Sequence, residues 1–303
     1  MLSEKEIAFK IKPITEEKAQ QDFIEFCKKA KDLRDKKENV ITDRCRIGND
    51  VVDFFTFEER LRTRSKYNIH FYDFVKRIDE FKEKRFIRNM LNYYEEVKNK
   101  NKTKNEYIVL KEVYNICIGA INIFRPLLAL EIYSTYNPTC VVDICAGWGG
   151  RSLGASAWKV PNYIGIDSNT NLKDGYDKLI KFLSDKSPTE IEMYYSDAVT
   201  FDYSKLPPYD MVFTSPPYYF LEKYSHCQYC DQKKSIMDVD FYKPLFSRSY
   251  EHLMDGGHMI LNVNQEIYER NCVPLFGKAH FIHLLKKSKR QNNYKECIYV
   301  WKK

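Results

Sequence analysis

Residues 140–151 read CVVDICAGWGGR, and this stretch decides the fold. Its first five residues are mostly β-branched or apolar, which predicts a short buried strand. The glycines that follow, and a run of small residues to about residue 158, predict a turn and then a helix. Glycine permits positive φ and lets the backbone approach a ligand closely. Ser152 stands where the third glycine of G-x-G-x-x-G would fall, which disfavours a dinucleotide-binding turn.

Two further predicted strands each end in an acid. Residues 162–166 lead into Asp167, a position from which a carboxylate can accept both hydroxyls of a ribose. Residues 191–196 lead into Asp197, where an acceptor could bind the exocyclic amino group of an adenine. Each acid, taken separately, is more often a surface or capping residue. Their order along the chain nevertheless predicts successive β-α units with ligands at the carboxyl edge of the sheet.

A fourth predicted strand, residues 211–213, runs into Ser-Pro-Pro-Tyr at residues 215–218. Two prolines fix φ and remove two backbone donors, so the turn is rigid. The Ser215 hydroxyl and the Pro216 carbonyl could accept from a planar amino group, while the Tyr218 ring stacks on the base. An isolated Pro-Pro-Tyr is more often only a loop. Its place after a strand of the same sheet favours the chemical interpretation.

These motifs resemble those of the amino-methyltransferases, the S-adenosylmethionine-dependent DNA enzymes that methylate adenine N6 or cytosine N4. The resemblance covers roughly residues 122–303, and the Ala-Gly-Trp-Gly-Gly-Arg variant is similar to phage and mobile-element relatives. It implies an α/β fold with a Rossmann-like, seven-stranded methyltransferase sheet and S-adenosylmethionine as cofactor. The family's catalytic motif falls on Ser215, Pro216, Pro217 and Tyr218. A serine at its first position is loosely associated with N4-cytosine enzymes and does not decide the base.

The resemblance also implies which residues bind the cofactor. Phe124 in Phe-Arg-Pro resembles the family's Phe-x-Pro motif, which contacts the methionine part; otherwise it reads as a core residue at a helix start. This chain departs from the family at Ile144, where a proline is usual, and at Gly150-Arg151, where a small hydroxyl residue is usual. The implied cofactor-binding residues are Phe124, Asp143, Ala146, Gly147, Gly149, Asp167 and Asp197.

The mechanism that the resemblance implies is direct transfer to a base that has left the duplex. The lone pair of the amino nitrogen is delocalised into the ring and becomes nucleophilic only as the group pyramidalises. Positioning and electrostatics, more than a strong general base, would then supply the catalysis. Flipping the base costs a few kcal/mol, which stacking on Tyr218 partly offsets.

The amino-terminal third is basic and is predicted to be mostly helical. The net charge of the chain is +7, and residues 60–104 contain fourteen Lys or Arg against six Asp or Glu. We expect residues 1–105 to form a helical target-recognition region that binds duplex DNA, with the polar run 98–106 as linker to a methyltransferase domain at 106–303. The basic residues alternate, as on an extended strand or a loop, at Arg60, Arg62, Arg64 and Lys66. A merely solvated charged face is the competing interpretation.

Length and composition agree with a chain of two domains. Its 303 residues, 44% hydrophobic and 30% charged, suffice for one large and one smaller domain. We expect a soluble, intracellular protein, because no apolar run approaches a membrane span and the start resembles no secretory signal. Nine cysteines without a framework predict reduced thiols. The sequence does not decide whether the protein forms a homodimer.

Other functions stay open as well. A zinc site at His226, Cys227 and Cys230 is disfavoured because a second close-spaced ligand pair is missing, so no metal is expected. Methylation of adenine N6 in RNA would use the same Pro-Pro-aromatic turn. Glutamine methylation in a protein is disfavoured by Ser215 and by the basic amino-terminal region. A non-catalytic nucleic-acid-binding subunit is disfavoured because the chain keeps both the glycine turn and Ser-Pro-Pro-Tyr.

Overall fold

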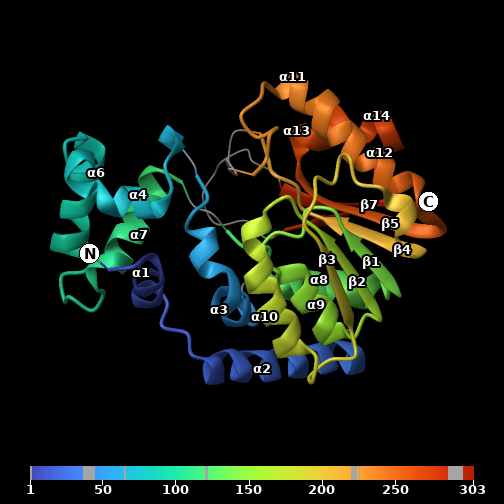
Figure 1. Cartoon of the computed structure of the whole chain (residues 1–303), viewed down its shortest axis with the longest axis horizontal. Helices are drawn as coiled ribbons and strands as arrows, with labels where there is room; N and C mark the ends of the chain where they lie inside the picture. The colour runs from blue at the N-terminus through green and yellow to red at the C-terminus, as the bar shows by residue number, and fades with distance from the viewer. Residues whose placement is uncertain are drawn as a thin grey trace.

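A seven-stranded sheet forms the centre of the larger part of the molecule (Figure 1). The computed structural model describes residues 2–36, 45–64, 66–119, 122–219, 224, 226–285 and 296–303. The strand order is β3-β2-β1-β4-β5-β7-β6; β7 runs antiparallel to both β5 and β6, and the pairings among β1 to β5 are parallel. The strands are β1 (Cys140–Asp143), β2 (Asn162–Ile166), β3 (Glu190–Tyr194), β4 (Tyr209–Thr214), β5 (Leu253–Asn264), β6 (Phe281–Leu284) and β7 (Glu296–Lys302).

Helices cover both faces of the sheet and extend to one side of it. The amino-terminal helices are α1 (Glu4–Ile11), α2 (Glu16–Lys36), α3 (Asn49–Arg60), α4 (Phe71–Lys76), α5 (Ile78–Lys82), α6 (Arg85–Tyr93) and α7 (Glu106–Cys117). Those that follow are α8 (Pro126–Tyr136), α9 (Gly150–Trp158), α10 (Lys173–Leu183), α11 (Lys234–Met237), α12 (Lys243–Glu251), α13 (Gln265–Ile267) and α14 (Val273–Phe276). Single 3₁₀ or π turns are η1 (Lys66–Asn68), η2 (Tyr94–Lys98), η3 (Thr170–Leu172), η4 (Tyr203–Lys205), η5 (Asp238–Tyr242) and η6 (Tyr268–Cys272).

The central strands are buried on both faces, which explains their continuous apolar sequences. All four residues of β1 are buried, and β4 buries five of its six. On one face η5 and α12 contribute Phe241, Tyr242 and Leu245 to the core. On the other face α8, α9 and α10 pack against the sheet, and α2 and α3 pack outside them. The predicted fold class, a Rossmann-like α/β sheet of seven strands beside a mostly helical amino-terminal region, is confirmed.

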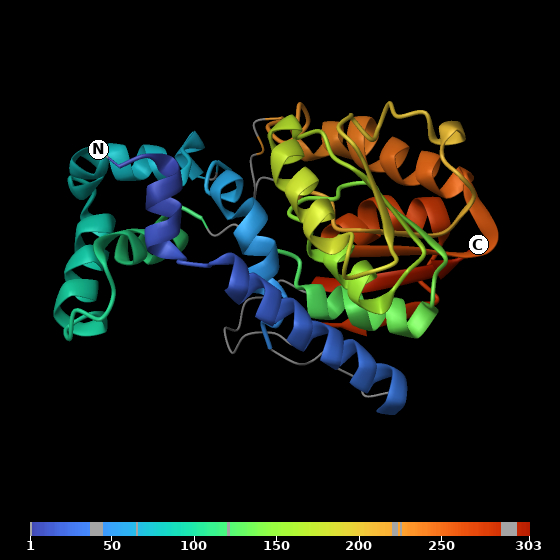
Figure 2. The same cartoon turned by 60° about the horizontal axis from the view of Figure 1, so that its bottom comes forward.

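The helices α1, α4, α5, α6 and α7 form a separate cluster beside the sheet, which both views show (Figures 1 and 2). We predicted a domain boundary at residues 105/106, but α7 belongs to this cluster, because its apolar face buries Leu110, Val113 and Tyr114 there. The polar run before α7 is not a linker. It is a turn closed by the Asn99 side chain, whose Nδ2 donates to the Lys104 carbonyl (2.9 Å) and whose Oδ1 accepts from the Lys104 amide (2.9 Å).

Helix α3 connects the helical cluster to the sheet. At one end Val51 and Val52 are fully buried against the α2, α8 and α9 side of the core. Beyond them, α3 lies directly on α10: a Cβ added at Gly175 would come within 2.7 Å of the Phe55 carbonyl oxygen. Glycine at this position therefore sets how closely the two helices approach.

No helix among the described residues is long and apolar enough to cross a membrane.

We expect Gly175→Ala to destabilise the protein by about 1 to 3 kcal/mol, because the added methyl group meets backbone that cannot rotate away. Urea unfolding monitored by circular dichroism measures this. Asp174→Ala, at the exposed neighbouring position, is the matched control and should stay within about 0.5 kcal/mol of the unaltered protein. Equal stabilities of the two variants would contradict the close approach of α3 and α10.

Candidate functional site

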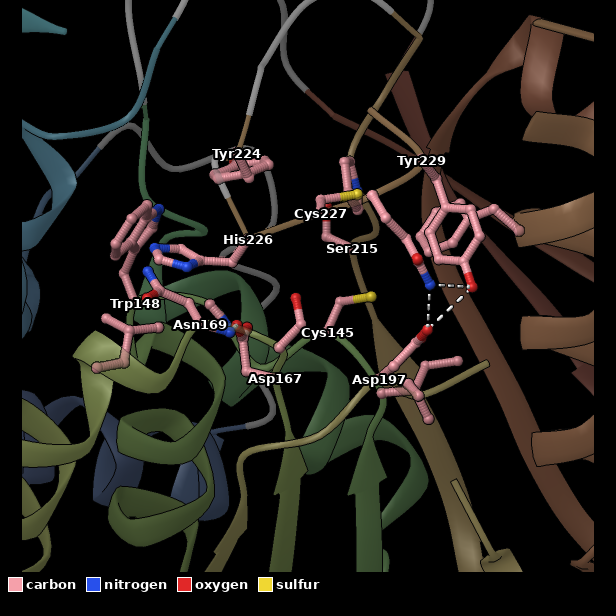
Figure 3. Close-up of a pocket in the computed structure, with 18 residues that line it drawn as sticks. Cys145, Trp148, Asp167, Asn169, Asp197, Ser215, Tyr224, His226, Cys227 and Tyr229 are labelled. Carbon is pink, nitrogen blue, oxygen red and sulfur yellow. Dashed lines mark hydrogen bonds between the residues drawn. The ribbon is translucent and has the colours of Figure 1, made fainter. Parts of the chain in front are cut away.

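A cavity of about 240 Å³ opens at the carboxyl ends of β1, β2, β3 and β4 (Figure 3). Side chains from the glycine turn after β1 and from the loops after β2, β3 and β4 converge on it. The lining residues are Ile144, Cys145, Gly147, Trp148, Asp167, Ser168, Asn169, Leu172, Asp197, Ala198, Ser215, Pro217, Tyr224, His226, Cys227, Gln228, Tyr229 and Phe241. Such a convergence at the carboxyl edge is where ligands bind in open α/β sheets.

The turn after β1 adopts the backbone conformation that its glycines allow. Gly147 and Gly149 have φ angles of 59° and 94°, in the left-handed region that residues with a Cβ rarely occupy. Gly150 has a different reason to be glycine: a Cβ there would lie 2.0 Å from the Phe124 carbonyl oxygen. The third glycine of this turn thus sits two residues before Ser152 and serves close packing against the segment that precedes α8.

A buried ion pair between Asp143 and Arg151 lies beneath the turn. The Arg151 Nε donates to Asp143 Oδ2 (2.6 Å) and its Nη2 donates to Asp143 Oδ1 (3.1 Å). The Tyr163 hydroxyl donates to Asp143 Oδ2 (2.6 Å), and the Arg151 guanidinium lies over the Phe124 ring at 5.1 Å. Asp143 is fully buried. Its carboxylate is therefore satisfied inside the protein, and Arg151 is its charged partner.

Asp167 lies at the cavity and is held in place by backbone donors. The Gly147 amide donates to its Oδ2 (2.7 Å), and the Asn169 amide donates to its Oδ1 (2.9 Å). Burial raises the pKa of Asp167, and these two hydrogen bonds partly oppose the rise. A carboxylate fixed in this way still has free lone pairs, so it can accept hydrogen bonds from a ligand in the cavity.

Asp197 bonds to the segment that crosses the cavity. Its Oδ2 accepts from Gln228 Nε2 (3.0 Å) and from the Tyr229 hydroxyl (2.9 Å), as Figure 3 shows. Its Oδ1 accepts from the Val199 amide (2.9 Å). A ligand amino group could bind the same carboxylate by taking the place of the Gln228 or Tyr229 donor.

The Ser-Pro-Pro-Tyr turn follows β4 and is held by Asn262 of the neighbouring strand β5. Asn262 Nδ2 donates to Ser215 Oγ (3.1 Å) and to the Tyr218 hydroxyl (2.8 Å). The Tyr218 hydroxyl in turn donates to the Asn262 carbonyl (3.0 Å). The Pro217 carbonyl accepts from the Tyr242 hydroxyl (2.5 Å). These bonds come from β5 and η5, so both ends of the turn are fixed to the rigid sheet.

The rim of the cavity is tied to α3 through Glu59. Its Oε1 accepts from Asn169 Nδ2 (3.1 Å) and from Asn171 Nδ2 (3.3 Å), while the Thr56 hydroxyl donates to the Trp148 carbonyl (3.0 Å). Arg62 donates to Glu59 Oε2 (2.8 Å). The amino-terminal region therefore helps to build the rim and is not only an appended module.

The four predicted nucleic-acid-binding residues lie at the end of α3 and in the loop after it, and no extended strand carries them. Arg60 is the last residue of α3 and pairs with the buried Asp53. Arg62 pairs with Glu4, Glu58 and Glu59. Arg64 follows in the loop and Lys66 begins η1. Arg60 and Arg62 are thus neutralised by carboxylates of the chain, which the alternating pattern gave no means to foresee.

The structure divides the predicted site residues into two groups. Gly147, Asp167, Asp197, Ser215 and Pro217 line the cavity. Within the described residues, the other members are not part of the cavity lining: Phe124, Asp143, Ala146, Gly149, Pro216 and Tyr218. Sequence reasoning missed Asn262, whose signal was a lone polar residue inside the apolar run 259–263, and it missed Glu59 and Asn169, which carried no signal.

The histidine and cysteines near the cavity form no metal cluster among the residues that the structure describes. Burial raises the pKa of the Cys145 thiol well above its ordinary value, so this cavity-lining thiol stays protonated and is a poor nucleophile. A second thiol that lines the cavity differs, because the side-chain hydrogen bond with Cys230 lowers the pKa of Cys227.

Neither a scan of protein-family models nor a search of curated proteins finds a match. Solved structures with a similar arrangement include the M. jannaschii tRNA m1G37 methyltransferase (14% identity, 61% of this chain and 51% of that chain, TM-score 0.41). Others are TrmN from Thermus thermophilus (16%, 59% and 49%, 0.40) and an rRNA methylase from Streptococcus thermophilus (11%, 60% and 99%, 0.41). This chain spans about half the length of the first two.

Asp143→Asn should destabilise the protein by about 3 to 5 kcal/mol, because it leaves the Arg151 charge buried without a counter-ion. Chemical denaturation measures the loss. The exposed pair Lys173 and Asp177 gives the matched control, since Asp177→Asn should cost no more than about 0.5 kcal/mol. A loss below about 1 kcal/mol for Asp143→Asn would mean that the ion pair does not hold the turn.

Proposed function

We propose that this protein transfers a methyl group from S-adenosylmethionine to the exocyclic amino group of a flipped-out base in DNA, either adenine N6 or cytosine N4. One observation carries the proposal: Ser215 of the Ser-Pro-Pro-Tyr turn lines the same cavity as Gly147 of the glycine turn and Asp167. Ser215, which can accept a hydrogen bond from an amino group, and Asp167, which can accept hydrogen bonds from a ribose, therefore face the same cavity. Transfer of a group between two ligands requires that both bind in one space.

The residues of the cavity suit the adenosine part of the cofactor. Asp167 supplies a fixed carboxylate for ribose hydroxyls, and Leu172 and Phe241 supply apolar walls. Ligand pockets usually have volumes of about 300 to 1,000 Å³, so a cavity of 240 Å³ is narrow for a whole cofactor. Binding would thus displace part of the segment that contains Gln228 and Tyr229, which frees Asp197 for an adenine amino group. Bound at this site, S-adenosylmethionine would supply an electrophilic methyl group.

Ser215 and Pro216 would hold the target amino group. Ser215 Oγ accepts one hydrogen bond from Asn262, which fixes the hydroxyl and leaves a second lone pair for an amino hydrogen. Acceptance of both amino hydrogens by Ser215 and the Pro216 carbonyl would favour the pyramidal geometry in which the nitrogen lone pair is nucleophilic. Asn262 acts through these residues and is a positioning residue.

Tyr218 would contribute a ring next to the base. Its hydroxyl is bonded twice to Asn262, so the ring has one orientation before any base arrives. A stacking partner that is already fixed loses little side-chain entropy on binding, and this helps to offset the unstacking of the flipped base. The other assignments taken from the resemblance, Phe124, Ala146 and Gly149, would then support the turn from behind.

Methylation of RNA is the second candidate, because the same acceptors would hold an adenine amino group of either nucleic acid. The test incubates the protein with labelled S-adenosylmethionine and either duplex DNA or RNA, then identifies the labelled nucleoside by mass spectrometry. N6-methyladenine or N4-methylcytosine from DNA is the expected product. Labelled nucleoside from RNA alone would replace the proposal by its rival, and label in neither polymer would contradict both.

Ser215→Ala should lower the rate of methyl transfer by about 100-fold or more, because it removes one acceptor of the amino group. Cofactor binding, measured by calorimetry, should not change, since the substitution leaves the carboxylates in place. Ser204→Ala, in an exposed 3₁₀ turn, provides the control. A transfer rate within about threefold of the unaltered enzyme would refute the role of Ser215.

Affinity for S-adenosylmethionine should fall as the pH falls toward the raised pKa of Asp167. The ionised carboxylate is the better acceptor for ribose hydroxyls, and a raised pKa means that protonation begins at a higher pH than for an ordinary aspartate. Calorimetric titrations between about pH 4 and pH 7 test this. Asp167→Asn should bind weakly and show no such dependence; an identical pH profile in both proteins would assign the effect to another group.

A further inference from the structure

Helix α6 exposes a face that no described part of the chain covers. Its inner side contributes Ile87, which is fully buried, and the partly buried Met90 and Leu91 to the helical cluster. At 100° per residue the remaining positions form one continuous surface on the opposite side. This α6 face consists of Arg85, Phe86, Arg88, Asn89, Asn92 and Tyr93, all of which are exposed.

The composition of the α6 face differs from that of an ordinary solvated helix. Helix α6 contains no acidic residue, although Glu83 precedes it and Glu95 follows it. Two aromatic rings, Phe86 and Tyr93, are each 43% exposed. Arginine, asparagine and aromatic side chains are those that bind base edges, phosphates and sugars.

The cations of the α6 face are available, whereas those on neighbouring helices are not. Within the described residues, no ion pair includes Arg85 or Arg88. By contrast, Arg77 pairs with Glu80 (2.7 Å) and Lys82 pairs with Asp79 (3.0 Å) on the adjacent turn and helix. The positive charge of these two arginines is not neutralised by a carboxylate of the described residues, so it can attract a polyanion.

We propose that the α6 face is the surface through which this protein binds duplex DNA, with α6 lying in the major groove. This inference rests on the proposed function and replaces Arg60 and Arg62 as the site of DNA contact. An α-helix with its side chains has a diameter of about 10 to 12 Å, which suits a groove about 12 Å wide. Arginine can bind guanine through two hydrogen bonds and asparagine can bind adenine in the same way, so the face can both hold DNA and distinguish sequences.

Duplex DNA suits this surface better than RNA does. The major groove of an RNA duplex is deep and narrow and does not admit a helix. Single-stranded RNA would be bound mainly by stacking, and Phe86 and Tyr93 lie among side chains that suit base edges instead. Lys84, at the amino end of α6, lies over the Tyr67 ring at 5.5 Å and adds a cation beside the face.

The position of α6 makes a further demand on the length of the DNA. Both views place α6 at the end of the molecule away from the sheet (Figures 1 and 2). A duplex that contacts the α6 face and also reaches the cavity must therefore extend across the molecule. Such a long duplex should bind more tightly than a short one, and substitutions on α6 should weaken binding of both.

The test measures binding of fluorescent duplexes of about 30 and about 8 base pairs, roughly 100 Å and 27 Å long, by anisotropy at several salt concentrations. The double variant Arg85→Ala, Arg88→Ala should bind the long duplex about tenfold or more weakly, with a smaller salt slope. The double variant Arg77→Ala, Lys82→Ala removes the same charge from ion-paired positions and should stay within about threefold. Asn89→Ala with Asn92→Ala keeps the charge and should weaken binding about fivefold without altering the slope.

Each result either supports the inference or overturns it. Equal losses in the α6 arginine variant and its charge-matched control would overturn the assignment, as would an unchanged affinity of the α6 arginine variant for both duplexes. If the unaltered protein methylates and binds DNA while the α6 variants behave like it, the inference fails and the proposed function stands. If the unaltered protein binds RNA and no duplex DNA, both fail. Calorimetry with S-adenosylmethionine should give the same affinity for every α6 variant, which shows that the fold is intact.

Discussion

The buried ion pair of Asp143 and Arg151 is the interaction on which the rest of the site depends. It lies under the turn after β1, where Arg151 bonds through two nitrogens to a carboxylate that Tyr163 also contacts. A buried charge is costly alone and tolerable when fully paired, so the pair enforces one geometry of the turn. In that geometry the Gly147 amide donates a hydrogen bond to Asp167, and Asp167 lines the cavity.

Side-chain hydrogen bonds connect the amino-terminal helices to the site. Glu59 of α3 bonds to two asparagines of the loop after β2, and Arg62 holds Glu59. Residues that look like a phosphate-binding strand in sequence thus belong to the structure of the rim. The surface that remains open for a polyanion lies farther along, on α6, where Arg85 and Arg88 have no carboxylate partner among the described residues.

The sequence predicts the sheet well and the partners of its charges poorly. Each strand of 140–143, 162–166 and 209–214 is short, apolar and followed by a turn signal, so local pattern suffices. Helix α7 lies beyond the boundary expected at residue 105 and packs with the amino-terminal helices, and such packing is tertiary information that local pattern does not contain. The pairing of Asp143 with Arg151, eight residues on, and of Arg62 with Glu4, from another helix, likewise requires the folded chain. Asn262 was accessible in principle, as a polar residue in a buried strand.

The central claim is that one cavity holds the cofactor beside the Ser-Pro-Pro-Tyr turn. The most direct measurement is a crystal structure of the protein with S-adenosylhomocysteine. We predict that the ribose hydroxyls bind Asp167 and that the sulfur atom points toward Ser215. Gln228 and Tyr229 should be displaced from Asp197. Density for the ligand elsewhere, or with its ribose turned away from Asp167, would contradict it.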